Sequence, residues 1–99
     1  MTIQYLQAYI KSKDHHPENT GGYFFKLMEE VGELAEAMRK GLRPAHENEI
    51  KNTVEEELWD VMYYLLAIAN CYDIDLEHAI RLKEEINNRK YDTGIELEA

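Results

Sequence analysis

Residues 56–72 of this 99-residue chain read EELWDVMYYLLAIANCY. From Leu58 to Tyr72 the only charged residue is Asp60. Because the run lacks the strict alternation of a strand, it predicts a helix that is buried almost all round. A chain of this length cannot cover such a helix alone, so we expect a homo-oligomer. We expect its interface to include at least one of three bulky residues, Trp59, Tyr63 or Leu66.

Helical periodicity continues along the rest of the sequence and predicts a single all-α domain over residues 1–99. The predicted helices span about residues 2–13, 23–40, from between 45 and 53 to 72, and from 73 or 75 to 91. Gly41 stands where a left-handed residue would end the second helix, and Asp73 or Asp75 can cap the fourth. We expect the tail, 92–99, to be loose.

Composition excludes several classes of protein. The 20 acidic residues against 11 Lys and Arg give a net charge of -9, which opposes binding to nucleic acid. Cys71 is the only cysteine, which excludes a disulfide framework and a cysteine-based zinc site. The start of the chain does not resemble a signal peptide, and the longest uncharged run, 61–72, is too short to span a membrane. We therefore expect a cytoplasmic protein without nucleic-acid or membrane partners.

Two pairs of carboxylates stand one helical turn apart, Glu30 with Glu33 and Glu57 with Asp60. On a helical wheel, each pair lies at or just beyond the edge of an apolar arc. The arc of the second helix, which we expect to face inward, comprises Phe24, Leu27, Met28, Val31, Leu34, Ala35 and Met38. Burying an ionised carboxylate is costly unless a cation or strong donors replace the water. The acidic pairs therefore need a positive partner.

That partner is either a basic side chain or a metal ion. Lys26 could pair with Glu30 at the i,i+4 spacing, which would make the first pair part of a solvated acidic face. Lys83, on the predicted inward side of the fourth helix, could pair with Glu57 or Asp60. Among metals, oxygen-only ligands favour Mg²⁺ or Mn²⁺ over zinc, and the chain lacks the Glu-x-x-His pairs of a di-iron bundle. Since Mg²⁺ usually binds proteins together with substrate phosphates, the metal alternative indicates a polyphosphate substrate attacked by water.

The motifs EEVGEL at 29–34 and EELWD at 56–60 resemble the E-x-x-E and E-x-x-D motifs of the MazG-like all-alpha nucleoside-triphosphate pyrophosphohydrolases. This superfamily includes the dimeric dUTPases, the dCTP pyrophosphatases and phosphoribosyl-ATP pyrophosphatase. The 23 residues between Glu33 and Glu57 suit the pattern. Two further matches, Lys83-x-x-x-Asn87-x-x-x-Tyr91 and His16-Pro17-x-Asn19, are similar to the single-domain dCTP-pyrophosphatase-like branch. The resemblance covers about residues 16–91, which we take as the core of the domain.

The resemblance implies a four-helix MazG-like bundle completed by assembly into a homodimer or homotetramer. It implies hydrolysis of a nucleoside triphosphate, either a dNTP or a non-standard NTP, to a monophosphate and pyrophosphate. The implied ligands of Mg²⁺, or of Mn²⁺ as a substitute, are Glu30, Glu33, Glu57 and Asp60. Lys83 would lie near phosphate, with Asn87 and Tyr91 near the sugar or base. Either Glu29 or Glu56 would orient the attacking water.

Two other functions stay open from the sequence. The pair Tyr63-Tyr64 does not reproduce the tyrosine-histidine pair expected of phosphoribosyl-ATP pyrophosphatase, which places that enzyme second. A catalytically silent helical oligomer that binds a nucleotide or a protein is the other alternative, although such a protein has no need to bury Asp60. The residues do not determine the preferred base and sugar, the choice between dimer and tetramer, or the number of metal ions.

Overall fold

The structure, a computed structural model, describes residues 1–92 and 94–97. It comprises α1 (Ile3–Lys13), the short 3-10 helix η1 (Pro17–Asn19), α2 (Thr20–Lys40), α3 (Val54–Cys71) and α4 (Leu76–Tyr91). The described residues include no β-strand, which confirms the all-α prediction. Within that same part of the chain, no helix is both long and apolar enough to cross a membrane.

Side-chain caps determine where three of the helices begin. The side chains of Thr2, Thr53 and Asp75 each accept a hydrogen bond from the backbone N–H three residues further on. Of the two aspartates predicted to cap the fourth helix, Asp75 is therefore the cap. Gly41 ends α2 with a φ of 64°, the left-handed conformation that the sequence predicted there. α2 begins three residues earlier than predicted, because η1 leads the chain directly into it.

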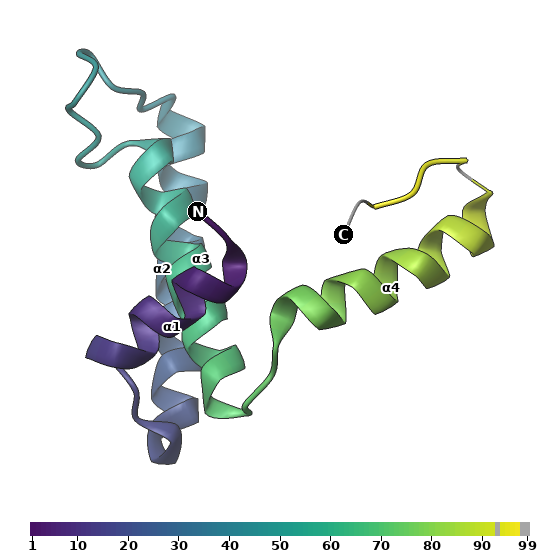
Figure 1. Ribbon diagram of the computed structural model, residues 1–99. Helices are drawn as coiled ribbons and strands as arrows, with labels where there is room; N and C mark the ends of the chain where they lie inside the picture. The colour runs from purple at the N-terminus through teal and green to yellow at the C-terminus, as the bar shows by residue number, and fades with distance from the viewer. Residues whose placement is uncertain (93, 98–99) are drawn as a thin grey trace.

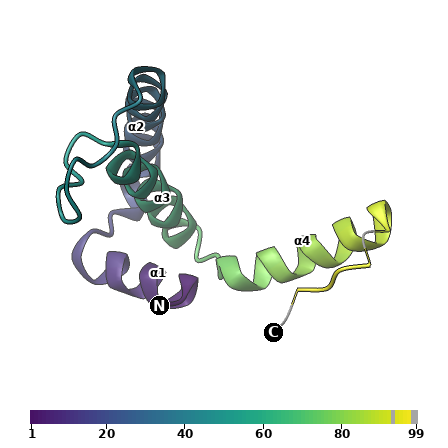
Figure 2. The ribbon, with the colours of Figure 1, turned by 90° about the horizontal axis from the view of Figure 1, so that it is seen from above.

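Helices α2 and α3 lie side by side and antiparallel, and α1 packs across α3 (Figure 1). In contrast, α4 extends away from the other three helices in both views, and its main helix contact is with α1 (Figures 1 and 2). A small core joins the first three helices and the start of the fourth. Its buried members are Ile10, Tyr23, Leu66 and Ala67, and Leu76 is among the half-buried residues packed against them.

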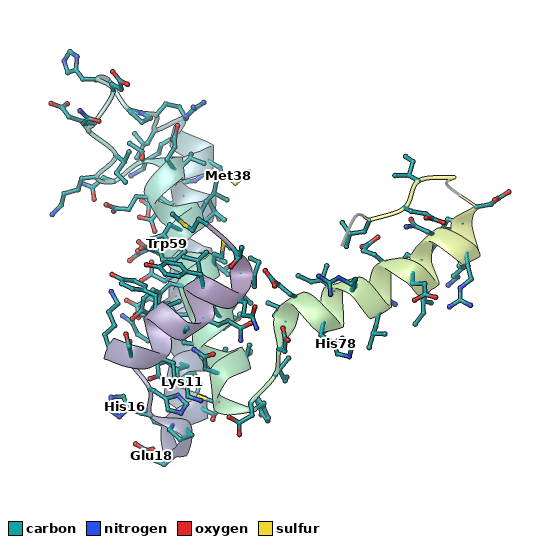
Figure 3. The ribbon with its side chains drawn as sticks, viewed as in Figure 1. Lys11, His16, Glu18, Met38, Trp59 and His78 are labelled. Carbon is teal, nitrogen blue, oxygen red and sulfur yellow. The ribbon has the colours of Figure 1, made fainter. Side chains whose placement is uncertain are left out.

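The core of one chain contains Leu66, which is only 1% exposed. The prediction that Leu66 could belong to an interface between chains is therefore wrong, because α1 and α2 already cover it. Trp59 is 36% exposed and Tyr63 is half-buried, so both are still accessible to a second chain. Figure 3 labels Trp59 in the upper half of the bundle, where it belongs to α3.

Two apolar faces predicted to point inward are open in the single chain. Of the predicted inward arc of α2, only Leu27 is buried, and four larger members are between 41% and 62% exposed, namely Phe24, Met28, Val31 and Met38. No residue of α4 is buried, and Ile80, Leu82 and Ile86 are all exposed. Within one chain, the prediction that these two faces point inward is wrong, because α4 does not fold back over α2.

Candidate active site

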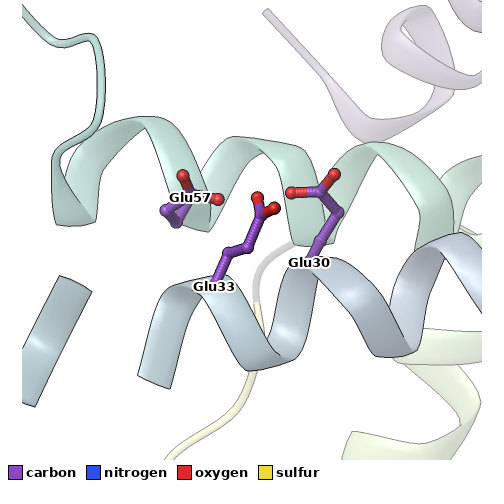
Figure 4. A group of neighbouring side chains, drawn as sticks. All are labelled: Glu30, Glu33 and Glu57. Atoms are coloured by element: carbon purple, nitrogen blue, oxygen red, sulfur yellow. The ribbon is translucent and has the colours of Figure 1, made fainter. Parts of the chain in front are cut away.

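Acidic side chains converge where α2 packs against α3. Carboxylate oxygens of Glu30, Glu33 and Glu57 lie within 4.8 Å of one another, and Figure 4 shows the three groups facing one another across the two helices. A second set, Glu56, Glu57 and Asp60, satisfies the same distance. We call these five residues the acidic cluster. Glu57 belongs to both sets and is therefore its centre.

The cluster follows from local helix geometry and from the pairing of α2 with α3. Glu30 and Glu33 are neighbours on one face of α2, and Glu57 and Asp60 are neighbours on the facing side of α3. Their burial is graded, since Glu57 is 7% exposed, Glu30 and Asp60 are half-buried, and Glu33 is exposed. The cluster therefore has a buried floor and one side open to a ligand.

Two carboxylate oxygens at the floor lack hydrogen-bond partners. Glu30 Oε2 and Glu57 Oε2 are both buried, and neither has a donor. Over the described residues, no Lys, Arg or His forms an ion pair with any member of the acidic cluster. Buried carboxylates without compensation are unfavourable, so the arrangement calls for a cation from outside the chain. The all-oxygen donor set fits a hard divalent ion such as Mg²⁺.

The electrostatics of the cluster agree with its geometry. Burial, hydrogen bonding with Glu33 and the negative charges of Glu33, Asp60 and Glu57 raise the pKa of Glu30 to about 7. Burial also raises the pKa of Glu57 and of Asp60, and the charges of Glu33 and Glu56 add to both shifts. A hydrogen bond with Glu30 opposes the shift of Glu57. These carboxylates therefore repel one another in the metal-free chain, and a bound cation would relieve that repulsion.

Neither ion pair considered from the sequence is present in the chain. Lys26 lies 3.4 Å from Glu29 Oε2, an i,i+3 pair on the outer side of α2, and it does not pair with Glu30. The interpretation of Glu30 as part of a neutralised, solvated face is therefore wrong. Lys83 is exposed on α4 and forms no ion pair with Glu57 or Asp60, because α4 leads away from the cluster.

The two candidates for orienting water differ in position. Glu29 is exposed, bound to Lys26 and outside both sets of converging oxygens. Glu56 belongs to the cluster, but its Oε1 also accepts the N–H of Asn52 at 3.2 Å, and its own N–H donates to Thr53 Oγ1 at 3.4 Å. This is close to a capping box, which the Thr-x-x-Glu spacing at 53–56 signals and which our sequence interpretation missed.

The structure does not bring the three predicted residues of α4 to the acidic cluster of the same chain. Lys83 and Tyr91 are exposed and Asn87 is half-buried on the helix that projects from the bundle. Lys90 lies over the Tyr91 ring, 5.3 Å from its centroid. Any contact between these residues and an acidic cluster requires a second chain.

Aromatic residues line the α3 side next to the cluster. Tyr64 follows Asp60 by one helical turn on α3. Burial raises the pKa of its hydroxyl, and the charges of Glu30 and Asp60 add to this shift while the charge of Lys26 opposes it. The ring of Tyr64 packs edge-on against Tyr63, 5.2 Å between centroids. Asp14, which the sequence did not single out, accepts hydrogen bonds from the hydroxyls of Tyr23 at 2.7 Å and Tyr63 at 2.8 Å. It therefore ties the end of α1 to both α2 and α3.

The raised pKa values predict how the stability of the metal-free chain depends on pH. A carboxyl whose folded pKa is raised binds more protons when folded, so its protonation stabilises the fold below the ordinary pKa of 4.5, and this stabilisation is lost as the pH rises towards 7. We expect the melting temperature in EDTA to fall by about 5 °C or more over this interval. At pH 8, Mg²⁺ should restore it.

Glu30→Gln is the control for that experiment, because it removes one of the repelling charges and keeps the volume. In this variant the fall in melting temperature between pH 4.5 and 7 should be smaller than in the wild type. Equal falls in the two proteins would contradict the assignment of the pH dependence to the acidic cluster.

Comparison with known proteins agrees with this architecture. The sequence profile described as the MazG nucleotide pyrophosphohydrolase domain matches residues 22–93, a range that contains both acidic motifs. Two crystal structures of iMazG from Vibrio DAT 722 are 47% and 48% identical to the chain, with TM-scores of 0.83 and 0.85. The alignments cover 89% and 92% of this chain and 99% and 98% of those chains.

Two curated relatives are similar over part of their length. An uncharacterized protein, YpjD of Bacillus subtilis (strain 168), is 40% identical over 70 residues, which is 68% of this chain and 63% of that protein. Human dCTP pyrophosphatase 1 is 35% identical over 86 residues, 78% of this chain and 46% of the human protein. The chain thus aligns with between about half and two thirds of each curated relative. Through the profile match and these likenesses, the chain belongs to the MazG nucleotide pyrophosphohydrolase domain family.

Proposed function

We propose that this chain hydrolyses a nucleoside triphosphate to a nucleoside monophosphate and pyrophosphate, with Mg²⁺ held by Glu30, Glu33, Glu57 and Asp60. The observation that supports this most strongly is the pair of buried, unpartnered oxygens, Glu30 Oε2 and Glu57 Oε2, inside a set of carboxylates within 4.8 Å. Membership of the MazG nucleotide pyrophosphohydrolase domain family supplies the reaction class.

Three of the carboxylates differ in their place in the proposed site. Glu57 and Glu30 form its floor, since they are the members whose buried oxygens lack donors. Glu33 lies on the open side, where a phosphate group can share its cation. Bound Mg²⁺ would neutralise phosphate charge and lower the pKa of a water molecule.

Glu56 is the better placed of the two residues proposed to orient the attacking water. One of its oxygens accepts the N–H of Asn52 just before α3, which fixes the side chain, and the residue converges with Glu57 and Asp60. Glu29 is held by Lys26 outside the cluster. We therefore propose that Glu56 orients the water and that Glu29 contributes only to the outer face of α2.

The substrate proposed first is a dNTP, and dCTP is the first candidate because one relative is a dCTP pyrophosphatase. Tyr64, one helical turn after Asp60 on α3, offers an aromatic face and a hydroxyl for a bound nucleotide. A modified NTP is the alternative substrate of the same reaction.

We further propose a homodimer or homotetramer built from residues 1–99 as one domain. α1 belongs to this domain because Ile10 is fully buried in its core. The open apolar faces of α2 and α4 supply the surface for association, which would bury the exposed side chains of Phe24, Met28 and Ile86. In such an assembly α4 of one chain would reach the acidic cluster of another, and Lys83, Asn87 and Tyr91 would meet the substrate there.

A substrate panel tests the proposed reaction. Incubation with standard and modified NTPs and dNTPs, and with phosphoribosyl-ATP, should give pyrophosphate and the monophosphate in equal amounts with Mg²⁺ and none with EDTA. The measurement is pyrophosphate release, with the nucleotide product identified by chromatography. A preference for phosphoribosyl-ATP would favour the biosynthetic enzyme. No release from any compound by folded protein would favour a silent nucleotide-binding oligomer.

A further inference from the structure

Two buried amide side chains, Gln7 of α1 and Asn70 near the end of α3, form a hydrogen-bonded pair. Gln7 Nε2 donates to Asn70 Oδ1 at 3.2 Å, and Asn70 Nδ2 donates to the backbone carbonyl of Gln7 at 2.9 Å. Gln7 is only 8% exposed and Asn70 only 6%. Such a pair specifies one geometry between the two helices, since a shift would leave buried amides without partners.

Gln7 also binds the segment that joins α3 to α4. Its Nε2 donates to the carbonyl of Ile74 at 2.8 Å, and its Oε1 accepts the N–H of Leu76 at 3.1 Å. Leu76 is the first residue of α4, and the N–H groups of a first turn have no acceptor within their own helix. Gln7 therefore caps α4 from a different helix and holds its linker on both sides.

Little else fixes the direction of α4. None of its residues is buried, and α1 is its main partner among the helices. Leu76 packs against the core, and Lys11 lies 3.8 Å from Asp73 in an exposed ion pair. The buried contacts that orient α4 are thus concentrated in its first residue and its linker, where Gln7 binds.

We infer that Gln7 is a positioning residue for the reaction, since it sets the direction in which α4 leaves the bundle. This inference rests on the proposed function, in which Lys83 and Asn87 of α4 bind the substrate at the acidic cluster of a second copy. An error in direction at Leu76 grows along the helix, because each residue adds about 1.5 Å of length. Loss of the Gln7 bonds therefore displaces Lys83 and Asn87 while the carboxylates stay in place.

The test compares Gln7→Met with Gln4→Met. Both remove an amide from α1 and keep the length of the side chain, but the side chain of Gln4 is exposed and forms no hydrogen bond with the described residues. Spin labels on cysteines at Arg39 of α2 and Arg81 of α4, in a Cys71→Ala background and diluted with unlabelled chain, report the direction of α4 as a distance distribution. Gln7→Met should broaden that distribution, and Gln4→Met should leave it as in the labelled parent.

Kinetics supply the second readout. In Gln7→Met, KM for the best substrate of the panel should rise about tenfold with a smaller change in kcat, because residues that bind the substrate move and those that hold the metal do not. Gln4→Met should behave as the wild type. An unchanged distance distribution in Gln7→Met would overturn the inference. A broadened distribution with unchanged KM and kcat would overturn the link to the reaction.

Hydrogen exchange in the wild type keeps the inference testable if Gln7→Met fails to fold. The Leu76 amide should exchange about tenfold more slowly than the amide of Glu77, for which the described residues provide no acceptor. Equal rates would contradict the cap. Neither hydrogen exchange nor the spin-label distances depend on catalysis. A wild type without activity would therefore count against the proposed function, whereas the exchange rates and distances would still support or refute the cap that Gln7 forms on α4.

Discussion

Glu57→Gln should lower pyrophosphate release by a factor of about 100 to 1,000 while leaving the chain folded. Glu57 belongs to both sets of converging oxygens, so its loss weakens every proposed arrangement of metal ligands. The amide retains the volume of the side chain at a position that is 7% exposed. Because burial raises the pKa of this carboxyl, removing its charge should also raise the melting temperature of the metal-free chain.

Glu36→Gln is the matched control for that variant. Glu36 lies on α2 but pairs with Lys40 at 2.8 Å on the outer surface, so the same chemical change should leave kcat and KM unaltered. Metal binding is measured by titration calorimetry with Mg²⁺ alone, which should detect weaker binding in Glu57→Gln. A variant that unfolds, with normal activity in the remaining folded fraction, would indicate a structural role for Glu57 and not a metal-binding one.

The four helices and several of their ends could be predicted because local signals determine them. Gly41 and Asp75 act on the backbone next to them, so the sequence predicted the left-handed end of α2 and narrowed the cap of α4 to Asp73 or Asp75. The convergence of Glu30 with Glu57 was also foreseeable, because two amphipathic helices joined by a loop pack with their neighbouring faces together.

The path of α4 could not be predicted from the same kind of signal. A helical wheel shows that Ile80 and Ile86 share an apolar face, but it does not say whether the covering surface belongs to the same chain. The direction of α4 depends on Gln7, which is 69 positions away from Leu76 in the sequence. It is equally hard to predict which of two adjacent carboxylates a lysine will pair with. Lys26, for example, pairs with Glu29 at the i,i+3 spacing and not with Glu30 at i,i+4.

Mixing two inactive variants should restore activity, provided that α4 of one chain binds the substrate at the acidic cluster of a second chain. Glu57→Gln removes the central carboxylate and Lys83→Ala removes the proposed phosphate contact, so each homo-oligomer should have low activity, with Lys83→Ala affecting substrate binding more than Mg²⁺ binding. When the two variants are unfolded together and refolded at equal amounts, about one quarter of the sites should combine an intact cluster with an intact α4. Activity should return to roughly that fraction of the wild type.

The control mixture contains Glu57→Gln and Asp60→Asn, whose lesions lie in the same cluster of one chain. No site in this mixture has an intact set of carboxylates, so its activity should stay as low as that of the separate variants. Analytical ultracentrifugation confirms that both mixtures assemble to the same size. Recovery in the first mixture alone would mean that Lys83 acts across a subunit boundary. Equal, low activity in both mixtures would mean that Lys83 does not act at the acidic cluster of a second chain, because the Glu57→Gln chains would then fail to supply it to the intact clusters of the Lys83→Ala chains.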